Sequence, residues 1–173
     1  MNTPINCPCG SASAYVQCCG LFHSGASIPL TAEALMRSRF SAFYLHNEAY
    51  LLATWNSAQR PASIDFSDEK TQWLKLEIIA IKKGGIKDHK GSITFNAHYL
   101  LDNEIRVMNE TSRFQKSDNR WFYITGNVKF YPAIEQPMMQ NRNALCLCGS
   151  GKKFKHCCVL PSSQKNESNQ WQK

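Results

Sequence analysis

The sequence predicts an α+β protein: a central domain, with helices first and a β-sheet after, flanked by a small cysteine module at each end. Three observations support this fold class. Apolar residues recur at spacings of three and four between 32 and 46, which is the period of an α-helix. From residue 73 onward, apolar and polar residues alternate, as in a β-strand. All eight cysteines fall into two tight clusters, within 7–19 and 146–158.

Helices are predicted in the first part of the central domain. Thr31 stands at the position of an N-cap, and a helix is predicted over 32–46. Its core face carries Met36, Phe40, Phe43 and Tyr44. A second helix is predicted over 48–55, before the break near Pro61.

Four strands are predicted after the helices. They cover 74–83, 93–101, 105–114 and 121–128. Turn-forming residues such as Gly, Asn, Asp and Ser stand between them, so each strand is expected to pair antiparallel with the next. Helices followed by a four-stranded meander give an α+β domain.

The two cysteine clusters form an internal repeat with the pattern C-x-C-G-S-x6-C-C. Zinc in a structural site takes four protein ligands in a tetrahedron, and each cluster supplies four thiols. We therefore predict two zinc ions, although four thiolates also suit iron, and a vicinal redox pair is a weaker alternative. Neighbouring helical residues point about 100° apart, so the chain must leave the helix at each Cys-Cys pair. The predicted ligands are Cys7, Cys9, Cys18, Cys19, Cys146, Cys148, Cys157 and Cys158.

Composition restricts the class of protein and of partner. Lys and Arg number 20 against 13 Asp and Glu, and the net charge of +7 favours RNA, an acidic protein surface or anionic lipid. No signal peptide is recognisable, and a run of about 18 apolar residues, as a membrane helix requires, occurs nowhere. We expect a cytoplasmic protein without membrane insertion, where reduced thiols bind metal instead of forming disulfides.

The C-terminal cluster lies in the run Cys146-Leu147-Cys148-Gly149-Ser150-Gly151-Lys152-Lys153-Phe154-Lys155-His156-Cys157-Cys158. This run closely resembles the SEC-C motif, first noted at the C-terminus of the SecA translocation ATPase. The resemblance implies zinc binding by the four cysteines and docking onto the SecB chaperone or the ribosome, with RNA contacts in the latter case. The N-terminal copy keeps the ligand positions but lacks the second glycine and the lysines, so we expect a structural cap there.

Two further segments are informative: Cys18-Cys19-Gly20-Leu21-Phe22-His23 and Met36-Arg37-Ser38-Arg39-Phe40. With them, the whole chain resembles the bacterial YchJ family of uncharacterised proteins. The resemblance implies that the middle domain is a nuclear-transport-factor-like cone, in which helices pack on a curved antiparallel sheet. The expected organisation is an N-terminal module over 1–25, the middle domain over 30–132, the C-terminal module over 143–160 and a disordered tail over 161–173.

Two classes of function follow from these features. In the first, the protein is an adaptor that meets an acidic partner through Lys152, Lys153, Lys155 and His156. In the second, the cone holds a pocket for a substrate or small ligand, with an acid/base pair of His98 and Glu110. Polar residues predicted for that pocket are Arg37, Arg39, His98, Glu110, Arg113 and Tyr123. Since neither a nucleophile elbow nor a phosphate loop is present, the adaptor is favoured over an enzyme.

Overall fold

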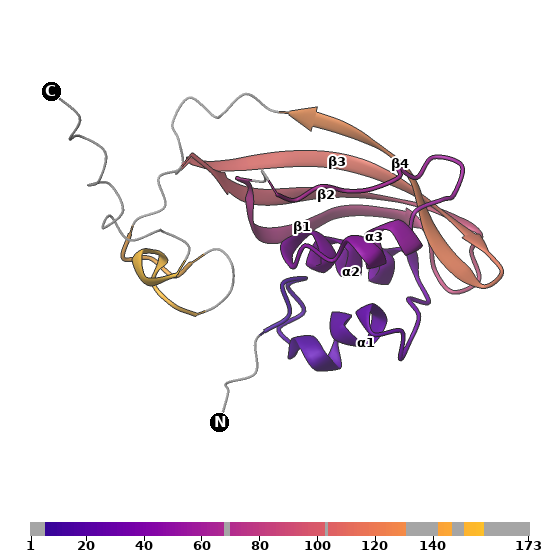
Figure 1. The fold of residues 1–173 in the computed structure, drawn as a ribbon, viewed down its shortest axis with the longest axis horizontal. Coiled ribbons are helices and arrows are strands. Elements are labelled where there is room, and N and C mark those ends of the chain that lie inside the picture. Colours follow the sequence, from indigo (N-terminus) through magenta and orange to yellow (C-terminus); the bar gives the residue numbers. More distant parts are fainter. Residues whose placement is uncertain (1–5, 68–69, 103, 131–141, 147–150, 158–173) are drawn as a thin grey trace, which may run out of the picture.

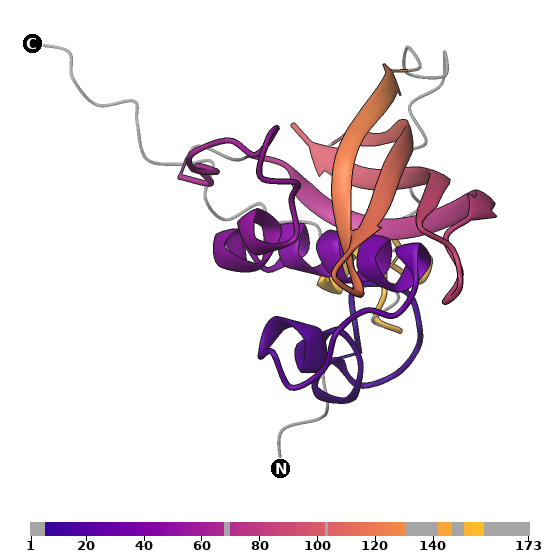
Figure 2. The same ribbon diagram turned by 90° about the vertical axis from the view of Figure 1, so that its right-hand side faces the viewer.

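The computed structural model describes residues 6–67, 70–102, 104–130, 142–146 and 151–157. The tail predicted over 161–173 lies outside these residues. Three layers are visible in Figures 1 and 2: the sheet, then helices α2 and α3, then the N-terminal segment that contains α1. The helices are α1 (Cys19–His23), α2 (Ala32–Tyr44) and α3 (Glu48–Ala53). The strands are β1 (Gln72–Lys83), β2 (Lys90–Leu101), β3 (Glu104–Ser117) and β4 (Arg120–Phe130).

The four strands form one sheet in the order β1-β2-β3-β4, with every neighbouring pair antiparallel. This confirms the predicted meander. Bulges interrupt the register twice between β1 and β2 and once between β3 and β4. Bulges increase local twist, so they help the sheet curve around the helices.

Helix α2 is the centre of the molecule. Thr31 caps it as predicted, because the Thr31 hydroxyl accepts a hydrogen bond from the Ala34 amide at 3.1 Å. One face packs its buried residues Leu35, Met36 and Phe40 into the main core, opposite Phe95 and Phe114 of the sheet. Tyr44 was predicted for this face but is 36 % exposed, because the helix ends at that residue.

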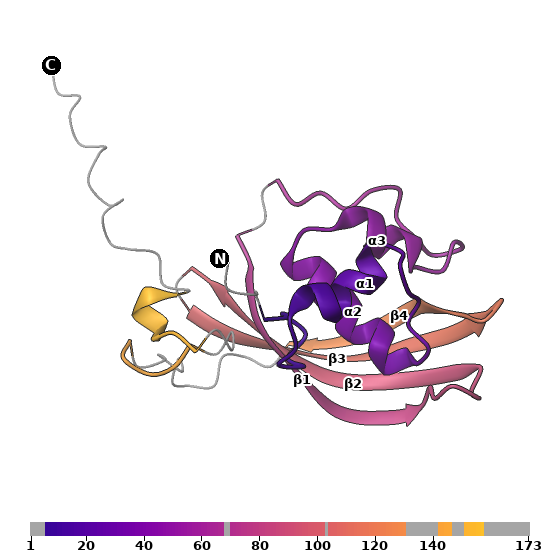
Figure 3. The ribbon, with the colours of Figure 1, turned by 90° about the horizontal axis from the view of Figure 1, so that it is seen from below.

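The other side of α2 is polar and yet covered. Ser38 and Ser41 are fully buried on this side. Figure 3 shows α1 lying across α2 on the side away from the sheet, which explains this burial. A helix enclosed on both sides does not show a single apolar stripe, so its amphipathic pattern is incomplete.

The segment after α3 joins the helices to the far edge of the sheet. The Tyr123 amide on β4 donates to the Thr54 carbonyl at 2.9 Å, and the Asn56 amide donates to the Tyr123 carbonyl at 2.8 Å. This short pairing closes the space between α2, α3 and β4. Among the described residues, no helix has the length and apolarity needed to cross a membrane.

Candidate functional site

The N-terminal cysteines converge as a metal-ligand set. The sulfur atoms of Cys7, Cys9, Cys18 and Cys19 all lie within 4.8 Å of one another. The Cys9–Cys18 and Cys18–Cys19 sulfur distances are 3.7 Å and 4.0 Å. A tetrahedron of thiolates with Zn–S bonds of about 2.3 Å has edges of about 3.8 Å, so the observed spacing is close to this geometry.

The local backbone explains how the four thiols meet. Gly10 has a φ of +81°, which allows the tight turn after the first cysteine pair. At Cys18 the backbone has φ −126° and ψ −111°, and α1 begins at the next residue. The prediction that the chain leaves the helix between the vicinal cysteines is confirmed. A 3-10 turn, η1 (Tyr15–Gln17), lies between the first and second cysteine pairs.

Close contact between the thiols shifts their pKa values in opposite directions. A hydrogen bond from Cys19 holds the pKa of Cys7 well below its usual range, and the same contact raises the pKa of Cys19. A cluster that shares its protons in this way cannot ionise fully without a compensating cation. A bound divalent metal would replace the protons, and its retention would weaken in acid.

Helix α2 fixes this cluster through polar contacts. The Arg37 guanidinium donates to the Cys9 carbonyl at 2.9 Å and pairs with Glu33 at 2.8 Å. The Ser41 hydroxyl lies 3.6 Å from the Cys7 sulfur. Arg37 was predicted to line a pocket in the central domain. It instead joins the N-terminal module to α2.

His23 links the same module to the helices without joining the ligand set. Its Nε2 donates to the Ser38 carbonyl at 2.9 Å, which leaves Nδ1 to accept from the Tyr15 hydroxyl at 2.7 Å. Its ring packs on Tyr50 with 4.4 Å between centroids. Burial lowers the pKa of His23, so the neutral ring suits this pair of bonds.

The described residues of the C-terminal module repeat backbone features of the N-terminal one. The Cys146 amide donates to the Lys152 carbonyl at 2.7 Å, and the Cys7 amide donates to the Ser13 carbonyl at 2.8 Å. Cys157 has φ −133° and ψ −89°, close to the values at Cys18. Each module also has one 3-10 turn, which is η2 (Phe154–His156) in the C-terminal copy. Two of the predicted ligands, Cys148 and Cys158, lie outside the described residues.

The C-terminal module packs against the end of the sheet through apolar contacts. Phe154 is 6 % exposed and packs with Cys146, Leu74 and Leu100 in one cluster. Lys152, Lys153 and His156 are exposed, while Lys155 is half-buried. The module therefore points its aromatic residue inward and most of its positive charge outward.

A pocket lies between α2 and the face of the sheet that packs on the helices, which we call the helix face. It has a volume of about 310 Å³. Its polar members are Arg39, Glu110, Ser112 and Tyr123, and its apolar members are Met36, Phe40, Phe43, Trp55, Trp73, Phe95, Ala97 and Met108.

Arg39 braces one wall of this pocket. Its Nη1 donates to the Leu51 carbonyl and to the Thr54 hydroxyl, each at 2.7 Å. The guanidinium also lies over Trp55 and Tyr123, 5.1 Å and 4.7 Å from the ring centroids. Burial lowers the pKa of Arg39 to about 10, so it stays charged at neutral pH.

Glu110, on β3, lines the same pocket as Arg39. One carboxylate oxygen accepts from the Ser112 hydroxyl at 2.5 Å and from the Tyr123 hydroxyl at 3.4 Å. A Cβ at position 126 would lie 2.0 Å from this oxygen, so Gly126 leaves the room that the carboxylate occupies. Burial, followed by the charge of Glu110, raises the pKa of Tyr123 to about 12 and keeps the hydroxyl protonated as a donor.

Comparison with known proteins agrees with this architecture. Residues 31–126 match the model of the YchJ middle NTF2-like domain, and residues 142–158 match that of the SEC-C motif. A UPF0225 protein of Serratia proteamaculans is 42 % identical over 162 residues, which cover 90 % of this chain and 98 % of the relative. The chain belongs to the YchJ (UPF0225) family.

Further relatives extend this result. A UPF0225 protein of Streptomyces avermitilis is 43 % identical over 71 % of this chain and 84 % of its own. The solution structure of a SEC-C motif containing protein from Rhodopseudomonas palustris has a TM-score of 0.63 and 28 % identity, covering 71 % of this chain and 98 % of that one. The crystal structure of one from Psychrobacter arcticus has a TM-score of 0.59 and 26 % identity, covering 88 % and 94 %.

One predicted pair of this YchJ-family protein requires correction. Glu110 pairs with Phe95 on the helix face, whereas His98 pairs with Val107 on the opposite, outer face. The His98 Nε2 lies 3.5 Å from Glu77, so the predicted His98–Glu110 acid/base pair does not form. Arg113 also lies on the outer face, and of the predicted pocket residues the structure brings together Arg39, Glu110 and Tyr123.

Sequence reasoning missed three residues that shape these sites. Ser41 contacts Cys7 across 34 positions, a distance at which no motif connects them. Trp55 and Trp73 line the pocket, and their indole N–H groups are buried without a hydrogen-bond partner in the described part of the chain. The N–H group of a buried tryptophan usually has a hydrogen-bond partner, so two unpartnered ones indicate a binding site. This signal can be recognised only once the fold is known.

Proposed function

We propose that this protein is a cytoplasmic, zinc-stabilised adaptor that docks an acidic partner through its C-terminal SEC-C module. The observation that carries the proposal is the orientation of that module. Phe154 is buried against the sheet, while Lys152 and Lys153 are exposed. A basic surface on a fixed support is suited to an acidic protein or to RNA phosphate.

The N-terminal cluster supports a structural metal in place of a catalytic one. Four protein thiols complete a tetrahedron, so the set leaves no position for water or substrate. Cys9 and Cys19 are at most 1 % exposed. We propose zinc in this cluster and a second zinc in the C-terminal one, to be measured by inductively coupled plasma mass spectrometry, where two zinc equivalents and no iron are expected.

Charge reversal tests docking. By resemblance to other SEC-C modules, the partners to try are ribosomes, by co-sedimentation, and the SecB chaperone, by pull-down. The variant Lys152→Glu with Lys153→Glu should lose at least tenfold in affinity, because two attractive charges become repulsive. Arg60→Glu with Lys70→Glu, an equal charge change at other exposed sites, is the control.

Three results would refute the adaptor. Neither partner binds the wild-type protein, both double variants lose affinity equally, or the module variant keeps full affinity. A selective loss by the module variant that is also sensitive to salt would establish the surface.

A second candidate function is the binding of a small aromatic molecule in the central pocket. The two unpartnered indole N–H groups of Trp55 and Trp73 favour a ligand with hydrogen-bond acceptors. The volume of about 310 Å³ suits a compact ring system. Anilinonaphthalene sulfonate, an aromatic anion, is a direct fluorescent probe.

Filling the pocket tests this candidate. Ala97 lies in the lining and is 1 % exposed, so Ala97→Leu should abolish probe binding. Thr94→Leu adds an apolar side chain on the outer face and should leave binding unchanged. Probe fluorescence that persists in Ala97→Leu, with folding confirmed by circular dichroism, would exclude the pocket as the site.

A further inference from the structure

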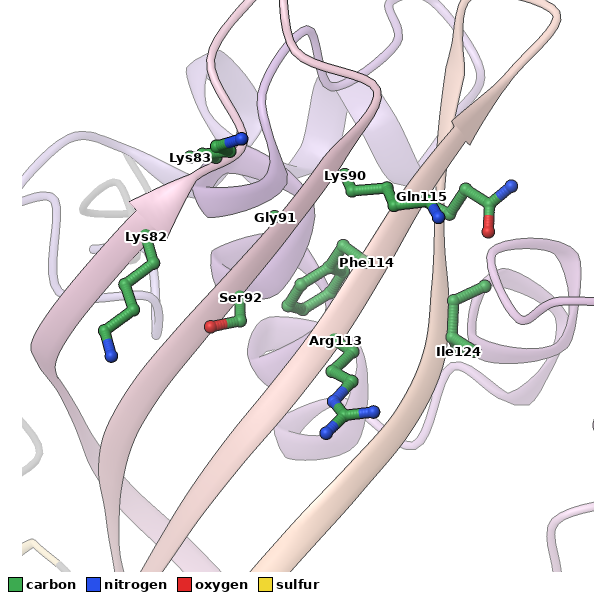
Figure 4. A pocket seen from close by; sticks show the side chains of 9 residues that line it. All are labelled: Lys82, Lys83, Lys90, Gly91, Ser92, Arg113, Phe114, Gln115 and Ile124. Atoms are coloured by element: carbon green, nitrogen blue, oxygen red, sulfur yellow. The ribbon is translucent and has the colours of Figure 1, made fainter.

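A basic groove lies on the outer face of the sheet (Figure 4). It is formed where β1 ends and β2 begins, at the end of the sheet opposite the C-terminal module, as the course of the strands in Figure 3 shows. Its volume is about 480 Å³. Four cations from three strands line it, and the described lining residues include no carboxylate. The lining comprises Lys82, Lys83, Lys90, Gly91, Ser92, Arg113, Phe114, Gln115 and Ile124.

Strand register creates this concentration of charge. Lys82 lies opposite Ser92, Ser92 lies opposite Arg113, and Arg113 lies opposite Thr125. Directly opposed residues share a face, so these four side chains form one row across all four strands. Strands are spaced by about 4.8 Å, which places Lys82 and Arg113 roughly 10 Å apart. Figure 4 shows both side chains over the outer face, with the helices behind the sheet.

The row continues into a second groove that shares Arg113. This groove, of about 410 Å³, is lined by Thr111, Arg113, Thr125, Gly126, Asn127 and Lys129. Thr111 also exchanges a hydrogen bond of 2.9 Å with Thr94. The surface therefore alternates cations with hydroxyl and amide groups along a track from β1 to β4.

The positive charge of this track is not balanced within the sheet. None of the ion pairs between described residues includes Lys82, Lys83, Lys90 or Arg113. Asp88, in the turn between β1 and β2, accepts a hydrogen bond from the Gly85 amide at 2.9 Å and so stabilises that turn. A track of unbalanced cations attracts a polyanion over a range of about 10 Å at ordinary salt concentration.

We propose that this groove binds the sugar-phosphate backbone of single-stranded RNA. Arg and Lys contact phosphates, and Ser, Thr, Asn and Gln side chains commonly add hydrogen bonds to phosphate and sugar oxygens. Hydroxyl groups both donate and accept, so they also match the ribose 2′-hydroxyl, which an acidic peptide lacks. Phe114 is 2 % exposed and offers no ring for base stacking, so the contact is independent of base sequence.

This surface is separate from the SEC-C module, and its test separates the two. A fluorescein-labelled 15-nucleotide oligouridine is titrated with the full-length protein, and binding is followed by anisotropy at several salt concentrations. Lys82→Glu with Arg113→Glu should weaken binding at least tenfold. Arg60→Glu with Lys70→Glu and Lys152→Glu with Lys153→Glu should each change it less than threefold. The four cations of the groove, Lys82, Lys83, Lys90 and Arg113, are all exposed, so their substitution should not disturb the core. Circular dichroism checks that each variant folds.

Salt dependence and competition complete the experiment. A single-stranded backbone gives a slope of about −0.7 in log K against log salt for each phosphate neutralised, so four groove cations predict roughly −3. Lys82→Glu with Arg113→Glu should bring this slope closer to zero. Absence of binding by the wild-type protein, equal weakening by all three double variants, or displacement of the RNA by polyglutamate at equal charge concentration would each overturn the proposal.

Discussion

The two cysteine modules have similar backbone conformations at the matching positions that the structure describes, but they join the central domain by opposite means. The N-terminal module contacts α2 through polar groups, with Arg37 on the Cys9 carbonyl and His23 on the Ser38 carbonyl. The C-terminal module packs Phe154 against Leu74 and Leu100 of the sheet. Two copies of one cysteine pattern therefore have different roles, because the surrounding residues decide which surface of each module remains accessible.

This difference extends to burial. Three of the four N-terminal cysteines are at most 5 % exposed, and their module covers the polar side of α2. In the C-terminal copy, Lys152 and Lys153 are exposed. The N-terminal module therefore covers part of the fold, whereas the C-terminal module presents its lysines to solvent.

The largest expected effect comes from removing one ligand in each module. Cys9→Ser should remove one zinc equivalent. It should also lower the free energy of unfolding by more than ~4 kcal/mol, because loss of the metal exposes Ser38 and Ser41 to solvent. Cys157→Ser should also eliminate one zinc equivalent but cost less than half as much. Metal analysis and urea denaturation measure both. Equal costs would mean that the two modules are coupled equally to the core.

The next effect concerns the packing of Phe154 against Leu74 and Leu100. Phe154→Ala should reduce hydrogen-exchange protection at 151–157 by an amount equivalent to about 3 kcal/mol, since a buried aromatic contact is lost. Tyr15→Phe, at the matching N-terminal position, removes only the bond to His23 and should cost about 1 kcal/mol. Unchanged protection in Phe154→Ala would show that the apolar contact does not fix the module.

Metal release gives a kinetic comparison. A colorimetric zinc chelator should remove the C-terminal ion at least tenfold more slowly, because Lys152 and Lys153 stabilise the negative charge of the zinc thiolates, whereas the N-terminal copy has Ser13 and Ala14 at the matching positions. Burial does not separate the modules, since Cys18 and Cys157 are both half-buried, and Cys7 and Cys146 are 5 % and 4 % exposed. Cys157→Ser and Cys9→Ser each leave one site to be observed alone. Equal release rates, or faster release from the C-terminal site, would contradict the role of the lysines.

The smallest effect lies in one turn. Ala12 has a φ of +61°, and Gly151, at the matching C-terminal position, has a φ of +71°. Because an L-residue is strained in this region, Ala12→Gly should stabilise the N-terminal module by up to ~1 kcal/mol, and Gly151→Ala should destabilise its own by about as much. Among the described residues, no atom lies within 4 Å of a Cβ added at 151, so backbone strain is the change expected there. Thermal unfolding and hydrogen exchange detect these shifts, and an effect of the opposite sign in either variant would contradict the reasoning.

Much of the fold was predictable from periodicity and spacing. The helix expected over 32–46 is observed at Ala32–Tyr44, and all four strands occur where alternation predicted them. The convergence of the N-terminal cysteines also followed from their spacing. Such features depend on residues close in sequence, whose geometry is set by helix and strand periods.

The pocket was harder to predict, because it depends on register and long-range contacts. Two bulges between β1 and β2 and the pairing of Val107 with His98 decide which face each side chain takes. Shifting one residue along a strand exchanges the two faces, so His98 and Glu110 cannot be assigned from the sequence alone. Similarly, the placement of Arg37 follows from its contact with Cys9, 28 positions away.

The meander has a consequence for the order of assembly. Every strand pairs with its neighbour in the sequence, so the sheet can form as soon as β4 has been synthesised. Leu74 packs against Phe154, which is synthesised 80 residues later, so this core contact forms last. The C-terminal module is thus added to a sheet that has already formed. Until then, Leu74 and Leu100 form an exposed apolar surface that a chaperone near the growing chain can bind.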